Sequence, residues 1–122
     1  MPPSKLTIVE RNADDVTVLV LTGEILLDDG DLVFRKAIHD LVAKGRVKIV
    51  VDLGGVTYID SSGVGMMAAK LKTVREAGGD MKLLHLTSRG QRLLGMMKLR
   101  TAFEIFEDED QAVRSYVWRP AG

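Results

Sequence analysis

The chain has 122 residues, of which 46% are hydrophobic and 28% are charged, values typical of one ordinary globular domain over residues 1–122. Its 17 basic and 17 acidic residues cancel, so the net charge favours neither nucleic acid nor a membrane as a partner. The sequence lacks cysteine, which excludes disulfides and thiolate chemistry, and no apolar stretch approaches the roughly 20 residues that span a bilayer. A cytoplasmic location is expected.

The N-terminal part of the chain predicts a β-hairpin. Residues 6–10 and 16–21 are short and rich in β-branched side chains, and the polar segment 12–15 between them suits a turn. The acidic segment 25–31 is predicted to be a loop, whose carboxylates can cap the following helix and favour its positive end.

Helices and strands alternate after this loop. Amphipathic spacing predicts a helix over residues 32–44, and Gly45 stands at the usual stop position. The nearly continuous apolar run 47–53 predicts a central strand that is covered on both faces. The pair Gly54-Gly55 is expected to break that strand.

The C-terminal half continues the alternation. Its predicted elements are a helix over 62–77, a strand over 81–86, a helix capped by Ser88 and Gln91, a strand over 102–106 and a last helix opened by Asp108, Glu109 and Asp110. The resulting order is β-β-α-β-α-β-α-β-α. It predicts an α/β fold with a mixed, mostly parallel sheet of about five strands, the hairpin at its edge and about four helices.

The helix predicted over 62–77 has an outward strip that is poor in charge near its first turns. At about 100° per residue, the sheet-facing stripe comprises Val64, Met67, Ala68, Leu71 and Val74. The outward strip comprises Ser62, Gly65, Met66, Ala69 and Thr73. Such small or uncharged side chains would let another protein approach the helix backbone closely. The alternative is that they are merely tolerated at a solvent face.

The two serines at the start of this helix separate on the same helical wheel. Ser61 rotates toward the sheet edge, where it can cap the helix, and Ser62 points outward. A phosphate on Ser62 would sit at the positive end of the helix dipole and add a charge of about −1.5 to −2. Asp60, Asp28 and Asp29 would be near enough to repel it. The alternative is an ordinary N-terminal helix serine.

Residues 50–65, with the sequence VVDLGGVTYIDSSGVG, resemble the signature of STAS domains. The likeness is greatest to the anti-sigma factor antagonists of bacteria, also called anti-anti-sigma factors. It extends over nearly the whole chain, including the turn at 21–24, the glycines at 78–79 and the closing segment 103–106. The segment 23–31 is longer and more acidic than in many members of that family.

The resemblance implies a phosphorylation-controlled binding protein rather than an enzyme, with no cofactor. Such proteins sequester an anti-sigma factor that is also a serine kinase of the GHKL type, which frees a sigma factor. Phosphorylation of the serine before the glycine breaks the complex, and a PP2C-type phosphatase restores it. Carried over to this chain, the phosphorylated residue is Ser62. The implied partner-binding residues are Asp28, Asp29, Asp60, Ser61, Ser62, Gly63, Gly65, Met66, Ala69 and Thr73.

Two other classes of function compete with this interpretation. The first is an enzyme, but the sequence has no nucleophile elbow, phosphate-loop lysine motif or metal-spaced cluster that would favour it. His39 and His85 suit packing or surface positions, and Asp60 lacks the acidic pair that a response-regulator receiver would carry. The second class comprises STAS subunits of lipid-transport ATPases and of stress-signalling scaffolds. A monomer or weak dimer is expected.

Overall fold

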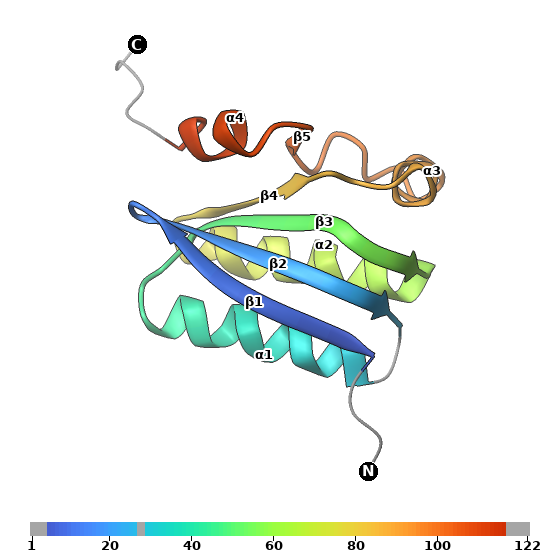
Figure 1. The fold of residues 1–122 in the computed structure, drawn as a ribbon, viewed down its shortest axis with the longest axis horizontal. Helices are drawn as coiled ribbons and strands as arrows, with labels where there is room; N and C mark the ends of the chain where they lie inside the picture. The colour runs from blue at the N-terminus through green and yellow to red at the C-terminus, as the bar shows by residue number, and fades with distance from the viewer. Residues whose placement is uncertain (1–4, 27–28, 117–122) are drawn as a thin grey trace.

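The computed structural model describes residues 5–26 and 29–116 (Figure 1). Its elements, in chain order, are β1 (Leu6–Ala13), β2 (Val16–Ile25), α1 (Asp29–Ala43), β3 (Lys48–Ile59), α2 (Ser61–Glu76), β4 (Asp80–Leu84), α3 (Ser88–Met96), β5 (Ile105–Phe106) and α4 (Glu109–Arg114). The five strands and four helices of these ranges confirm the predicted α/β class. No helix among the described residues is both long enough and apolar enough to cross a membrane.

The strands form one mixed sheet in the order β1-β2-β3-β4-β5. β1 pairs antiparallel with β2, and every later neighbour pairs in parallel. The hairpin turn lies at Asp14 and Asp15, where Asp14 takes a φ of 58°, a left-handed conformation that aspartate tolerates better than most residues. The predicted hairpin edge is therefore confirmed.

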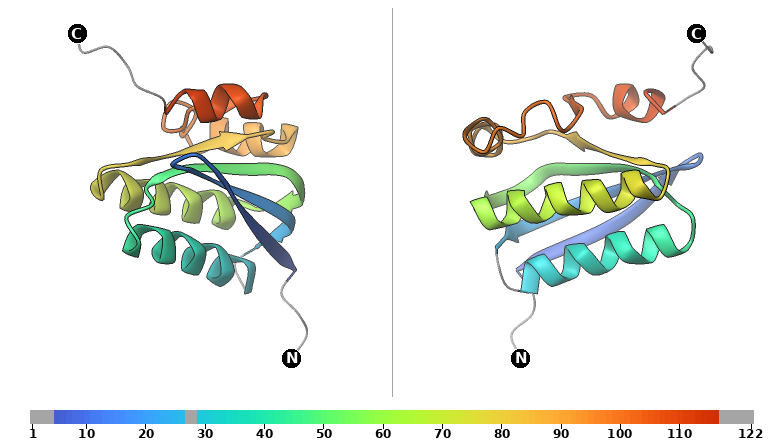
Figure 2. Two further views of the ribbon diagram at one scale, coloured as in Figure 1. Left: turned by 60° about the vertical axis from the view of Figure 1, so that its left-hand side comes forward. Right: turned by 180° about the vertical axis from the view of Figure 1, so that it is seen from behind.

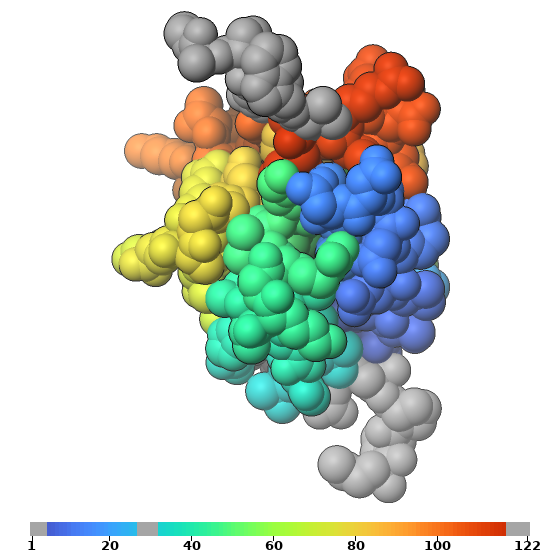
Figure 3. All heavy atoms as spheres, turned by 90° about the vertical axis from the view of Figure 1, so that its left-hand side faces the viewer, coloured from blue at the N-terminus to red at the C-terminus, as the bar shows by residue number. Residues whose placement is uncertain are grey.

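Helices cover both faces of the sheet, because side chains alternate along each strand. α1 and α2 lie side by side on one face, and α4 lies on the other (Figures 1 and 2). Along β2, Leu19 and Leu21 join the larger core cluster with α1 and α2, whereas Val16 and Val18 join a smaller cluster with Ala112 of α4. Figure 3 shows the end of the molecule that carries the hairpin turn and the C-terminal ends of α1 and α2. The start of α2 and all of α3 lie toward the opposite end (Figure 1).

A buried lysine stands on the face that α4 covers. The Lys82 side chain is 3% exposed, and its Nζ atom donates to Ser115 Oγ at 2.6 Å. The ammonium group also lies 3.5 Å from Glu104 Oε2 and 4.2 Å from the centroid of the Tyr116 ring. A buried charge requires such partners, since desolvation would otherwise outweigh any gain. The contacts with Ser115 and Tyr116 attach the two residues that follow α4 to β4.

The expected break at Gly54-Gly55 is wrong, because β3 continues through both glycines to Ile59. The register against β2 shifts here, which marks a β-bulge that leaves an extra residue on β3. A Cβ atom on Gly55 would lie 2.9 Å from the carbonyl oxygen of Leu21. The absence of a side chain therefore lets β3 stay close to β2.

Several other helix and strand boundaries differ from those predicted from the sequence. β2 extends to Ile25 and α1 begins at Asp29, so the acidic loop predicted over 25–31 is wrong and only a short connection joins the two elements. β4 ends at Leu84, two residues early, because His85 has a left-handed φ of 56° that a strand cannot continue through. β5 is limited to residues 105–106, and turns occupy the start of the predicted strand.

Candidate functional site

The β3–α2 corner, Asp60–Ser62, connects the long central strand to its following helix. Asp60 is the N-cap of α2, and its Oδ1 atom accepts a hydrogen bond from the backbone N–H of Gly63 at 2.8 Å. The backbone N–H of Asp60 donates to the Ile25 carbonyl at 3.4 Å, and the Asp60 carbonyl accepts from Val64 at 3.1 Å. The corner is thereby attached to the end of β2 on one side and to α2 on the other.

Ser61 and Ser62 form the first two positions of α2, and both are exposed. Neither hydroxyl has a hydrogen-bond partner within residues 5–26 and 29–116. The expectation that Ser61 caps the helix is wrong, because Asp60, one residue earlier, already reaches the N–H at the third position. The Ser62 hydroxyl therefore lies at the positive end of α2 and neither caps the helix nor bonds to another described residue.

Gly63 lies beneath this corner and is buried. A Cβ atom there would lie 2.8 Å from the Ile25 carbonyl oxygen and 3.1 Å from Ile59 Cγ1. Glycine thus allows the first turn of α2 to rest directly on the ends of β2 and β3. This packing presents the preceding serines to the outside, and it makes Gly63 itself inaccessible to a partner's side chains.

The outward strip of α2 is narrower than the helical wheel predicts. Ala69 is exposed, and the half-buried Thr73 donates its hydroxyl hydrogen to the Ala69 carbonyl at 3.2 Å. Gly65 is half-buried and faces Met97 of the α3 region, since a Cβ atom on Gly65 would lie 3.9 Å from Met97 Cε. Met66 is half-buried and packs against the core, so its expected outward position is wrong.

Arg89, in the first turn of α3, holds the end of β3 that leads into the corner. Its Nε atom donates to the Ile59 carbonyl at 2.8 Å, and an Nη atom donates to the Tyr58 hydroxyl at 2.9 Å. The guanidinium also stacks 4.4 Å from the Tyr58 ring centroid. No sequence pattern indicates this role, because Arg89 and Tyr58 are 31 residues apart and meet only in the folded chain.

Comparison with known proteins shows the family to which this chain belongs. The sequence pattern of the STAS domain matches residues 7–112. The chain belongs to the STAS domain family. It is 29% identical over 106 residues to the anti-sigma-B factor antagonist of Bacillus subtilis, a match that covers 87% of this chain and 94% of that protein.

Two further proteins show the extent of the likeness. The STAS domain described here is 26% identical over 98 residues to the anti-sigma F factor antagonist of Paenibacillus polymyxa, which covers 80% of this chain and 84% of that one. The crystal structure of an anti-sigma factor antagonist from Mycobacterium paratuberculosis has the same fold, with a TM-score of 0.80 and 23% identity. That likeness covers 93% of this chain and 96% of the other.

Two acidic residues predicted to bind a partner, Asp28 and Asp29, are adjacent in the sequence near the start of α1 of the STAS domain. Asp28 lies outside the described residues, and Asp29 is the first residue of α1. Asp29 opens the element that follows β2, and the end of β2 contacts the corner through the Ile25 carbonyl. Their part in binding stays a prediction.

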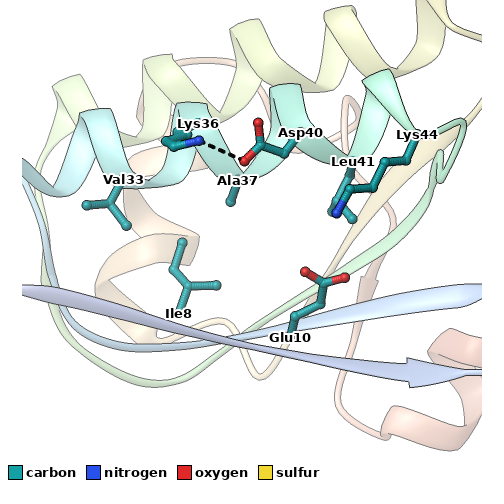
Figure 4. A pocket seen from close by; sticks show the side chains of 8 residues that line it. All are labelled: Ile8, Glu10, Val33, Lys36, Ala37, Asp40, Leu41 and Lys44. Atoms are coloured by element: carbon teal, nitrogen blue, oxygen red, sulfur yellow. Dashed lines mark hydrogen bonds and ion pairs between the residues drawn. The ribbon is translucent and has the colours of Figure 1, made fainter.

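A pocket of about 310 Å³ lies between α1 and the edge strand β1 of the STAS domain (Figure 4). The residues that line it are Ile8, Glu10, Val33, Lys36, Ala37, Asp40, Leu41 and Lys44. Apolar side chains form its floor, and charged ones, including the Lys36–Asp40 ion pair of 3.0 Å, stand at its rim. None of the predicted site residues is among these, so the pocket is separate from the β3–α2 corner.

A polar pair joins β3 to the residue after β4. His85 Nδ1 lies 3.0 Å from Asp52 Oδ1, which also accepts from the backbone N–H of Gly54 at 2.9 Å. The hydrogen bond that the His85 ring donates to Asp52 raises the pKa of His85 above its ordinary 6.5, although partial burial opposes the shift, and the nearby Glu107 adds to it. The sequence favoured a packing or surface role for His85, and its exposed ring beside Asp52 agrees with the surface alternative.

The STAS domain is expected to lose a small stabilisation as this histidine deprotonates. Because the folded-state pKa of His85 is raised, the contribution is complete below about pH 6.5 and disappears as the pH rises through the folded-state value. Asp52→Asn should return the pKa of His85 toward its ordinary value, as measured by NMR titration of the ring proton on Cε1. An unchanged titration in Asp52→Asn would show that Asp52 does not set this pKa.

Proposed function

We propose that this STAS domain is an anti-sigma factor antagonist, a binding protein of the bacterial cytoplasm that acts without catalysis. In its unphosphorylated form it sequesters an anti-sigma factor that is also a GHKL-type serine kinase, and a sigma factor is thereby freed. Phosphorylation of Ser62 releases the kinase, and a PP2C-type phosphatase reverses the modification. The observation that carries the proposal is the exposed hydroxyl of Ser62 at the tip of α2, which makes no hydrogen bond to any of the described residues.

Access to the kinase supports Ser62 as the phosphorylated residue. A hydroxyl can enter another enzyme's active site only if it projects from the surface, and Ser62 does so without giving up a hydrogen bond to the described residues. The corner on which it stands is held by the hydrogen bond between Asp60 and Gly63, by the bond to the Ile25 carbonyl and, through the end of β3, by Arg89. The acceptor can therefore be presented in one geometry, with no cost of local unfolding.

The phosphate would change binding rather than folding. At the second position of α2 it would lie close to the positive helix terminus, which favours negative charge. The same charge would enter a docking surface whose neighbours, Ser61 and Ala69, are uncharged and exposed. A desolvated charge without a partner weakens an interface strongly, so the modification would release the kinase and leave the domain folded.

The docking surface in this proposal centres on α2. Ser61, Ser62 and Ala69 contribute exposed atoms, with Thr73 at the margin and Asp60 behind the serines. Gly63, Gly65 and Met66 shape the surface from beneath, because each is wholly or partly buried. The proposal also includes Asp29, the first residue of α1, and Asp28, the residue before it in the sequence. The names of the Bacillus subtilis and Paenibacillus polymyxa relatives, both antagonists of anti-sigma factors, support this class of partner.

Phosphorylation of purified protein by the cognate GHKL-type kinase tests the proposal. With labelled ATP, wild type and Ser61→Ala should incorporate phosphate, whereas Ser62→Ala should incorporate none, because only Ser62 is the acceptor. Ser61→Ala is the matched control, since Ser61 is equally exposed and adjacent. Labelling of Ser62→Ala at the wild-type rate would refute Ser62 as the acceptor, and wild type that neither binds the kinase nor is labelled would refute the proposed function.

A further inference from the structure

The chain is neutral overall, but its charges are separated along the sequence. Residues 81–103 include five basic residues and no acidic one, namely Lys82, Arg89, Arg92, Lys98 and Arg100. Lys82 is buried and Arg89 is engaged at the end of β3, as described above. The other three side chains are exposed, and none has an ion-pair partner among the described residues. A concentrated positive surface therefore surrounds α3.

Lys98 occupies a backbone position that usually belongs to glycine. α1 and α2 end in one hydrogen-bonding pattern, with Gly45 and Gly78 in the left-handed region at φ values of 76° and 92°. α3 ends in the same pattern: Lys98 donates to the Gly95 carbonyl at 3.2 Å, and Leu99 donates to the Leu94 carbonyl at 2.8 Å.

In α3, however, the left-handed residue is Lys98, with a φ of 59°. A side chain at this position carries a conformational cost that the other two helix ends avoid. Strained residues of this kind are concentrated at functional sites. The conformational cost of the left-handed backbone at Lys98 therefore points to a functional role for its side chain.

A large apolar side chain projects beside these cations. Met96 is 78% exposed, whereas Met67 and Met81 are fully buried. Arg92 precedes Met96 by one helical turn and so lies on the same face of α3. Arg100 lies against Gly95, since a Cβ atom on that glycine would be 3.8 Å from Arg100 Nε. We call these four residues, Arg92, Met96, Lys98 and Arg100, the α3 patch.

The α3 patch adjoins the surface already proposed for the kinase. α3 and the start of α2 lie at the same end of the molecule (Figures 1 and 2). Gly65 of α2 faces Met97, the residue between Met96 and Lys98. A partner that covers the exposed side of α2 can therefore reach α3 without crossing a third element.

We infer that the α3 patch is a second contact for the anti-sigma factor, binding an acidic surface with an apolar depression that receives Met96. This inference rests on the proposed function. Three cations that have no ion-pair partner in the described part of the chain surround one exposed methionine, and this arrangement suits a protein surface, because protein interfaces combine a central apolar anchor with a charged rim. Opposite charges on the partner would mainly accelerate association and select the correct kinase.

Charge reversal tests the inference. Binding of the cognate kinase is measured at 50 and 500 mM salt for wild type, Arg92→Glu and Lys98→Glu. Each variant should lose about tenfold or more in affinity at low salt, chiefly through slower association, and less at high salt. Lys44→Glu is the matched control, because Lys44 is exposed at the end of α1, away from α3. It should change the affinity less than twofold.

Lys98→Gly separates the functional use of this residue from a structural one. Glycine relieves the left-handed strain, so the melting temperature should rise by about 2–4 °C. Removal of the cation should nevertheless weaken kinase binding about threefold at low salt. A stabilised variant with wild-type affinity would overturn the inference, since Lys98 would then be strained without a binding role.

The remaining outcomes discriminate between the two proposals. A complex that is weakened by Ala69→Arg on α2 but indifferent to Arg92→Glu and Lys98→Glu would overturn the inference and leave the proposed function intact. Wild type that forms no complex would overturn both. The acidic residues of 104–110 in a second copy are another conceivable occupant. Salt-sensitive self-association that Lys98→Glu abolishes, with kinase binding unchanged, would assign the patch to that copy and overturn the inference.

Discussion

Ser62→Glu is expected to weaken the complex with the anti-sigma factor kinase by about 100-fold or more, which corresponds to about 2.8 kcal/mol. The carboxylate would place an unpaired charge among the uncharged, exposed positions at the start of α2. The melting temperature should stay within about 2 °C of wild type or rise slightly, because acidic side chains are favourable in the first turn of a helix. Calorimetric titration with the kinase and a thermal melt measure the two quantities.

Ser62→Gln is the matched control for this variant. Glutamine has nearly the size and shape of glutamate but no charge, so any loss of affinity in Ser62→Gln reports steric obstruction. We expect the affinity for the kinase to fall by less than about tenfold in Ser62→Gln, compared with about 100-fold or more in Ser62→Glu. Equal losses in the two variants would show that bulk, rather than charge, controls the complex, and a phosphate would then act by a different mechanism.

Gly63→Ala should destabilise the domain by about 2–3 kcal/mol, because the new methyl group overpacks a buried site. Its Cβ atom would lie 2.8 Å from the Ile25 carbonyl oxygen and 3.0 Å from Ile25 Cγ2. The clash involves backbone of β2, so the start of α2 must move away from the sheet to relieve it. Urea-induced unfolding gives the free energy directly, provided that the slope of the transition is unchanged.

Gly65→Ala provides the comparison for Gly63→Ala. The two glycines are two residues apart on α2, but a Cβ atom on Gly65 would meet only Met97 Cε, at 3.9 Å. Alanine favours a helix interior over glycine, so Gly65→Ala should stabilise the domain by about 0.5–1 kcal/mol. Similar destabilisation in both variants would mean that the packing of Gly63 against Ile25 is not what makes glycine necessary there.

The larger features of this fold follow from local patterns in the sequence. The nearly continuous apolar run 47–53 specifies a buried central strand, and the two segments rich in β-branched residues around a polar turn specify an edge hairpin. The sheet-facing stripe of α2 was also predictable, and four of its five members, Val64, Met67, Leu71 and Val74, are buried. These signals are strong because each depends only on the period of the backbone and on the hydrophobicity of the side chains.

The errors arise where one residue's conformation depends on a distant neighbour. Gly54-Gly55 looks like a strand break, yet β2 approaches so closely that the glycines permit pairing instead of ending it. Met66 lies on the outward side of an isolated helix, but it packs against the core once α2 has neighbours. A helical wheel contains no information about either neighbour.

The N-caps of α2 and α3 also could not be predicted from local sequence alone. Ser61 and Ser88 are good capping residues, yet Asp60 and Thr87 cap α2 and α3, each one residue earlier. Several side chains near a helix start can accept the same N–H, and the incoming strand decides which of them is in position. At α2 this choice has a consequence for function, since it leaves both serine hydroxyls unbonded to the described residues.

The sequence by itself determined the sheet, the helices and a serine at the start of α2, because these depend on local periodicity and on a short motif of neighbouring residues. Only the tertiary structure decided how that serine is presented. Ile25 and Arg89, from opposite sides of the sequence, hold the corner, and Gly63 is buried beneath it. The exposure of Met96 and the left-handed backbone of Lys98 likewise depend on how α3 packs, which no local pattern specifies.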